Sequence, residues 1–131
     1  MTDIAHFNMV EQQIRPWDVH SLSVLEAISE LDRSLFVPAE HQAQCFFDAE
    51  IPLDASTRML APRVAGRMVQ ALEIKAKDHV LVVGAGSGYS AALCAMLADT
   101  VVCQDEEQNA LERAEQNCSA AGIKNIGFHS P

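Results

Sequence analysis

The residues with the clearest capacity for chemistry are three glycines in the five-residue loop Gly84-Ala85-Gly86-Ser87-Gly88. An almost wholly apolar run, 78–83, precedes this loop, and a compact Ala-rich segment, 89–98, follows it. Glycine adopts backbone angles that other residues avoid and lets a ligand approach the main chain closely. Amides at a helix start favour an electronegative group. The order strand, glycine loop, helix therefore favours a nucleotide-type ligand, with a plain tight turn as the alternative.

The spacing of the glycines indicates which ligand. The dinucleotide fingerprint G-x-G-x-x-G needs a glycine at position 89, which is Tyr89. The third glycine comes one residue earlier, at Gly88, and gives G-x-G-x-G. This shorter spacing is typical of S-adenosylmethionine sites, which hold no pyrophosphate. An NAD-dependent oxidoreductase is correspondingly disfavoured.

A carboxylate after the second expected strand supports the same interpretation. Asp105 lies 17 residues beyond Gly88 and can accept hydrogen bonds from two ribose hydroxyls. Glu106 and Glu107 follow it, so the sequence leaves an ambiguity of one residue about which carboxylate contacts the ribose. The structural alternative is that Asp105 caps the next helix, with acidic neighbours in its first turn.

These residues need a parallel sheet to position them. Short apolar strands are expected at 78–83, 100–104 and 125–129, and helices at 89–98 and 106–121, the second closed by Gly122. This βαβαβ order predicts an α/β, Rossmann-like fold with about three parallel strands. The run 78–83 is apolar throughout, so we expect it to be buried on both faces.

A helical region should precede the sheet. We divide the chain into a helical N-terminal region with a connecting arm, 1–75, and a partial Rossmann-like unit, 76–131. Helices are expected from Thr2 to about Gln13, from a cap at Ser21 or Ser23 to before Phe36, and over about 63–74. Residues 39–62 form the arm. The expected apolar stripes comprise Ile4, Phe7, Val10 and Ile14 in the first helix, Leu22, Val24, Leu25, Ile28 and Leu31 in the second, and Val64, Met68 and Leu72 in the third.

Composition excludes several classes of partner. A formal net charge of −9 argues against nonspecific binding of nucleic acid and against an anionic membrane surface. The amino terminus does not resemble a secretory signal, and the apolar stretches are short of a membrane span. The cysteines form no C-x-x-C pair, so we expect buried thiols, a cytoplasmic protein and no metal site; they are Cys45, Cys94, Cys103 and Cys118.

Four segments together resemble one protein family. They are Met9-Val10-Glu11-Gln12-Gln13-Ile14-Arg15, Leu35-Phe36-Val37-Pro38, Phe47-Asp48 with Ile51-Pro52-Leu53, and Val80 to Tyr89. From about Met9 to Phe128 the sequence is similar to protein-L-isoaspartate O-methyltransferases, which are class I S-adenosylmethionine-dependent enzymes. The resemblance implies methyl transfer to isoaspartyl carboxylates of damaged proteins or peptides. It implies cofactor contacts at Gly84, Ala85, Gly86, Ser87, Gly88, Tyr89 and Asp105.

One departure concerns catalysis. The family carries T-I-S-Q-P before the helix that leads into the glycine strand, and its serine is thought to contribute to catalysis. Here the aligned stretch reads Arg58-Met59-Leu60-Ala61-Pro62. Leu60 stands at the serine position and has no hydrogen-bonding side chain. We therefore assign no catalytic residue, and a noncatalytic cofactor-binding protein or pseudoenzyme fragment is the alternative.

The last expected strand lies close to Pro131, where the sequence ends. Complete sheets of this class have about seven strands, so we expect a truncated chain with an incomplete sheet. An uncovered strand edge tends to associate. Self-association through this edge is therefore expected.

Overall fold

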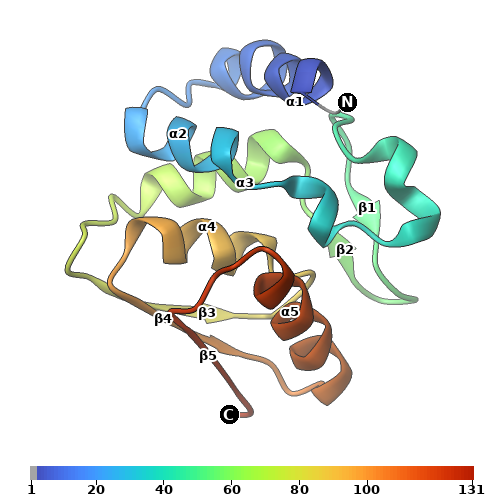
Figure 1. Ribbon diagram of the computed structural model, residues 1–131, viewed down its shortest axis with the longest axis vertical. Coiled ribbons are helices and arrows are strands. Elements are labelled where there is room, and N and C mark those ends of the chain that lie inside the picture. The colour runs from blue at the N-terminus through green and yellow to red at the C-terminus, as the bar shows by residue number, and fades with distance from the viewer. Residues whose placement is uncertain (1–2) are drawn as a thin grey trace.

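A computed structural model describes residues 3–131 of the protein (Figure 1). The expected helical start at Thr2 lies outside the described residues. The N-terminal region is helical as expected. Its elements are the α-helix α1 (Asp3–Met9), the π-helical turn η1 (Val10–Ile14), the 3₁₀ turn η2 (Arg15–Trp17), and the α-helices α2 (Leu22–Glu30) and α3 (Pro62–Ala71).

The arm, 39–62, contains short elements, as its lack of periodicity predicted: the 3₁₀ turn η4 (Ala39–Gln44) and the strands β1 (Ile51–Pro52) and β2 (Arg58–Met59). The second helix is shorter than predicted, because α2 ends at Glu30 and the separate 3₁₀ turn η3 (Arg33–Phe36) follows it. The two strands pair antiparallel, with Ile51 opposite Met59. We refer to residues 51–59 as the arm hairpin.

A three-stranded parallel sheet forms the second half of the chain and confirms the predicted fold class. Its order is β3-β4-β5, and each crossover passes through one helix. The elements are β3 (His79–Val83), α4 (Tyr89–Leu97), β4 (Thr100–Gln104), α5 (Gln108–Ala120) and β5 (Ile126–His129).

Helix ends follow the chemistry of their sequences. Ser21 is the N-cap of α2, and its hydroxyl accepts a hydrogen bond from the Val24 amide. At the end of α5, Gly122 has a φ of 79° and the Ile123 amide donates to the Cys118 carbonyl. This is the left-handed termination predicted for Gly122.

Three expected apolar stripes were wrong in part. Ile4 and Phe7 of α1 and Leu22 of α2 are exposed, although Val10 and Ile14 are buried. The π-helical turn η1 changes the residue period between these two pairs.

On α3, Met68 and Leu72 are exposed, and the buried face is formed by Ala65, Gly66 and Val69. A β-carbon at Gly66 would lie 3.4 Å from Ile14, Val19 and Ile28. Small residues therefore mark the buried face because they let the neighbouring helices approach closely.

Strand β3 is not buried on both faces, which corrects the sequence prediction. Leu81 and Val83 are 57% and 78% exposed, while Val80 and Val82 are partly buried against the core. The helices lie on one side of the sheet, and no described element covers the other (Figure 1). One face of each strand therefore remains open, and only the covered face carries the core.

Buried residues from both halves of the chain belong to a single hydrophobic cluster. It runs from Met9 and Ile28 of the helical region to Leu93 of α4 and Leu111 of α5. The boundary near residue 75 stays a prediction. No helix in residues 3–131 is long and apolar enough to cross a membrane.

Candidate cofactor-binding site

The glycine loop joins β3 to α4 in a conformation that requires glycine. Gly84, Gly86 and Gly88 have φ values of 95°, 52° and 90°, all in the left-handed region. The loop is tied to the sheet because the Gly84 amide donates to the Gln104 carbonyl at 2.8 Å. The backbone therefore requires glycine at all three positions, as predicted.

Helix α5 holds the carbonyl side of this loop. Residues 113 and 117 lie one helical turn apart on α5, and Cys118 follows on its buried face. Each donates to a different loop carbonyl. The bonds are Arg113 Nε to Gly86 O at 2.9 Å, Asn117 Nδ2 to Ser87 O at 2.9 Å, and Cys118 Sγ to Gly88 O at 3.5 Å.

The amide side of the loop is different. Within residues 3–131, no hydrogen bond reaches the Gly86 or Ser87 amide, although Ser87 is buried. Both residues line a cavity of about 230 Å³. Backbone amides that are withdrawn from water are almost always paired. Ser87 is buried and Gly86 is partly buried, so their two unpaired amides beside a cavity indicate a place for an acceptor group. The other lining residues are Thr57, Arg58, Met59, Leu60, Ala65, Gly84, Ala85, Tyr89 and Ser90.

Asp105 lies at the expected strand end but is not the N-cap of α5, because that position is Glu107. Its Oδ2 accepts from the Ala85 amide at 2.8 Å, and its Oδ1 accepts from the Glu107 amide at 2.9 Å. Each carboxylate oxygen keeps one further lone pair. Asp105 therefore links the glycine loop to the start of α5 and retains capacity for a ligand.

A second hollow, of about 280 Å³, lies on the Asp105 side of the loop. Gly84 lines both hollows, so they adjoin across the first glycine. The second is lined by Val83, Gly84, Gln104, Asp105, Glu106, Glu107 and Pro131. The arrangement provides backbone amides on one side of Gly84 and carboxylates on the other.

The arm hairpin forms the wall opposite the glycine loop. Leu60, the position of the family serine, lies in this wall. The hairpin is joined to α5 by an ion pair between Asp54 and Arg113 at 3.2 Å. Hydrogen bonds from the Ser56 amide and from Arg113 lower the pKa of Asp54 to about 2, so this carboxylate is ionised at neutral pH.

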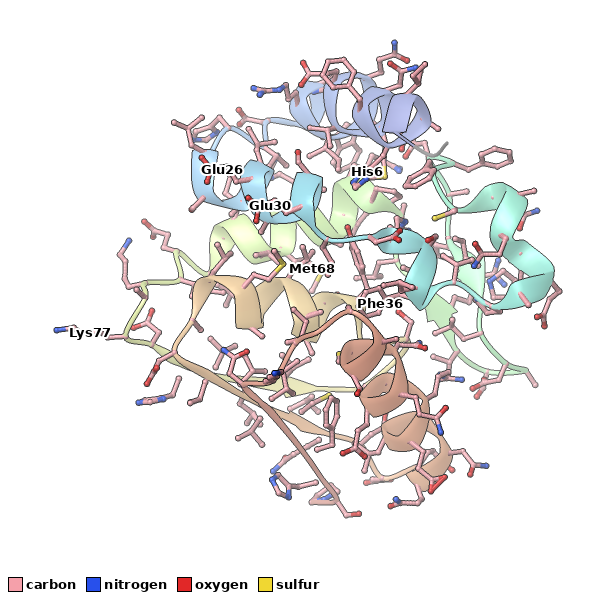
Figure 2. The ribbon with its side chains drawn as sticks, viewed as in Figure 1. His6, Glu26, Glu30, Phe36, Met68 and Lys77 are labelled. Atoms are coloured by element: carbon pink, nitrogen blue, oxygen red, sulfur yellow. The ribbon has the colours of Figure 1, made fainter. Side chains whose placement is uncertain are left out.

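Tyr89 begins α4 and is almost fully buried between the loop and the N-terminal region. Its ring meets Phe36 edge-on, with centroids 5.5 Å apart. Figure 2 shows Phe36 at the η3 turn, close to α4. Burial raises the pKa of the Tyr89 hydroxyl, although the neighbouring Arg33 charge opposes this effect.

Several of these residues were not identified from the sequence. Arg33, Arg113 and Asn117 belong to no motif, although the spacing of 113 and 117 places them on one helix face.

No three His, Cys, Asp or Glu side chains in the described part of the chain are grouped to hold a metal ion.

The structure also brings together residues that are distant in sequence and that line neither hollow. The Arg63 guanidinium lies over the Trp17 ring at 4.4 Å and pairs with Asp48 at 2.6 Å. The side chain of Arg67 donates to the Trp17 carbonyl.

Comparisons with known proteins agree with this geometry. Residues 5–130 match the family model "Protein-L-isoaspartate(D-aspartate) O-methyltransferase (PCMT)". A protein-L-isoaspartate O-methyltransferase of Methanoculleus marisnigri is 36% identical over 118 residues, which are 90% of this chain and 54% of that protein. One of Aeropyrum pernix is 37% identical over 93% of this chain and 48% of its own length. The chain thus spans about half the length of the curated relatives it matches.

Solved structures give the same fold. A protein-L-isoaspartate O-methyltransferase structure superposes with a TM-score of 0.78 at 19% identity, over 99% of this chain and 42% of that one. A putative enzyme of this name from Plasmodium falciparum, in complex with S-adenosyl-L-homocysteine, gives 0.73 at 16% identity, over 95% and 62%. With the family motifs in place around an open glycine loop, the chain belongs to the protein-L-isoaspartate(D-aspartate) O-methyltransferase family of class I methyltransferases.

Proposed function

We propose that the chain binds S-adenosylmethionine across the glycine loop. The observation that carries this proposal is the pair of unpaired amides at Gly86 and Ser87, in a loop whose carbonyls are already held by α5. These amides suit the carboxylate of the cofactor's amino-acid part. Asp105, in the adjoining hollow, suits the ribose hydroxyls.

The proposed reaction is transfer of the cofactor's methyl group to an isoaspartyl carboxylate of a damaged protein or peptide. The sulfonium donor is already activated, so the residues of the site act mainly by holding acceptor and methyl group in line. In this proposal the acceptor enters the cavity of about 230 Å³ from the arm-hairpin side, and the cofactor's amino-acid part lies against the glycine loop on the other side of the same cavity. The four buried thiols fit a reducing compartment, and a cytoplasmic location is part of the proposal.

A second candidate function rests on Leu60. This side chain lies in the cavity wall where the family has a serine, and it offers no hydrogen bond to an acceptor. A protein that binds S-adenosylmethionine without transferring its methyl group is therefore the alternative.

The cofactor proposal is tested by calorimetric titration of the 131-residue chain with S-adenosylhomocysteine. Asp105→Asn should weaken binding about ten- to a hundredfold, because a hydrogen bond to a charged group contributes about 1.5–3 kcal/mol. Glu106→Gln is the matched control and resolves the ambiguity of one residue. Wild-type affinity in a folded Asp105→Asn variant would contradict the ribose role, and no binding by the folded wild type would contradict the proposal.

The two candidate functions are separated by transfer of labelled methyl from S-adenosylmethionine to an isoaspartyl peptide. If the chain is an enzyme limited by its missing serine, Leu60→Ser should incorporate label faster than the wild type. Cofactor binding without incorporation in either protein would favour the noncatalytic alternative.

A further inference from the structure

Arg33 is a fully buried cation next to the proposed site. It extends from η3, has no exposed surface, and contacts three segments that are distant in sequence. Its Nε donates to the Cys45 carbonyl at 2.8 Å, and its Nη2 donates to the Leu60 carbonyl at 3.1 Å. Its guanidinium carbon lies 4.7 Å from the centroid of the Tyr89 ring.

The charge of Arg33 has no carboxylate partner. No ion pair involves Arg33 within residues 3–131, and its Nη1 is buried without a hydrogen-bond partner. Two carbonyl dipoles and an aromatic face compensate a buried guanidinium only in part. The part of this charge that stays uncompensated favours an anion nearby.

The other cations of this region differ from Arg33. Arg58 pairs with Glu50 at 3.2 Å, and Arg63 pairs with Asp48 at 2.6 Å. Both pairs are partly exposed, so solvent screens them. Arg33 is therefore the uncompensated charge behind this part of the cavity wall.

Two of the three Arg33 contacts belong to the wall of the cavity. Leu60 and Tyr89 both line it, together with the glycine loop. The hydrogen bond to the Leu60 carbonyl fixes residue 60 in this wall, and the same guanidinium places its charge directly behind residue 60.

We infer that Arg33 is a positioning residue that fixes residue 60 against the glycine loop and makes this side of the cavity favour an anionic group. Because Arg33 is fully buried behind the cavity wall, it acts through residue 60 and does not touch a bound group itself. The inference deepens the proposed function, because a carboxylate acceptor would be the anion that this potential holds near the methyl group.

The test places a titratable anion at the wall. In Leu60→Cys the thiolate itself is the probe, and its pKa is read from the pH dependence of alkylation by iodoacetamide. The native thiols are buried, and burial raises the pKa of Cys45, Cys94 and Cys103 to about 11 and that of Cys118 to about 12, so they react slowly. The expected pKa of the new thiol is roughly one unit or more below the ordinary value of about 8.5.

Variants of Arg33 separate charge from packing. Arg33→Met in the Leu60→Cys background should raise the thiol pKa by roughly one unit, and Arg33→Lys should restore most of the depression because it keeps the charge. A shift smaller than about 0.3 units in a folded Arg33→Met protein would overturn the inference.

If Arg33→Met does not fold, Thr57→Cys supplies the comparison, with Asp54→Asn in both proteins because the Asp54 carboxylate accepts from the Thr57 amide and would raise the pKa of a thiol there. Thr57 lines the same cavity, and the hydrogen bonds of Arg33 go to Cys45 and Leu60. The Leu60→Cys thiol should then have the lower pKa of the two, and equal values would overturn the inference. No step needs S-adenosylmethionine, so failure of cofactor binding and failure of this inference are distinguishable.

Discussion

Gly88 occupies a position where both the backbone and the surroundings exclude a side chain. Its φ is 90°, and a β-carbon there would lie 3.0 Å from the Ala114 carbonyl oxygen and 3.1 Å from the Ala114 β-carbon. Gly88 thus sets how closely the loop approaches α5. Gly122 has a similar φ of 79°, but a β-carbon there would meet nothing within 4 Å.

We expect Gly88→Ala to destabilise the protein more than Gly122→Ala. The control should lose about 1–2 kcal/mol from the left-handed backbone alone. The loop variant should lose about 1–3 kcal/mol more from the clash with α5. Urea unfolding of both variants measures the difference, and equal losses would show that α5 moves away freely.

At the scale of elements, α5 supports the cofactor loop. It donates to three successive loop carbonyls and pairs with the arm hairpin through Asp54. The amides of Gly86 and Ser87 therefore remain beside the cavity, without a hydrogen-bond partner in the described chain. The helix contributes no proposed ligand contact itself, yet it determines which polar groups the loop can offer.

Asn117→Ala should lower the free energy of unfolding by about 1–2 kcal/mol, because the partly buried Ser87 carbonyl loses its donor. Asn109→Ala is the matched control on the same helix, where the side chain is exposed. It should be neutral or slightly stabilising, since alanine has the higher helix propensity. The urea midpoints of the two variants measure the difference. Equal midpoints would indicate that the Asn117 hydrogen bond contributes nothing to stability.

At the scale of the whole molecule, the sheet has an uncovered face and an open edge. Leu81, Val83 and Val102 are exposed on that face, and β3 pairs only with β4 among the described strands. Unpaired strand edges next to exposed apolar side chains promote pairing between chains. The net charge of −9 opposes this association at low salt.

Self-association through β3 therefore stays a prediction that can be measured. The weight-average mass in sedimentation equilibrium should rise with protein concentration, and more steeply at higher salt because charge repulsion is screened. Val83→Lys should lower this mass, whereas Phe7→Lys, on exposed α1, should not. If the protein is a monomer at every concentration and salt, or if both variants have the same effect, association through the β3 edge is excluded.

The sequence by itself determined the fold class, the order of elements and the glycine loop. These depend on local chemistry: left-handed angles need glycine at 84, 86 and 88, a serine caps α2, and apolar runs form the strands. Motifs spread from Met9 to Phe128 also identified the family, because each is a fixed string that needs no contact information.

Only the tertiary structure decided which apolar residues are buried and what surrounds the loop. Met68 and Val83 have core-like side chains but are exposed, because burial depends on whether another element covers that face. The roles of Arg33 and Arg113 depend on contacts across 27 residues or more, to Leu60 and to Gly86. Such pairs leave no periodic signal in the chain, so only the packed molecule brings them together.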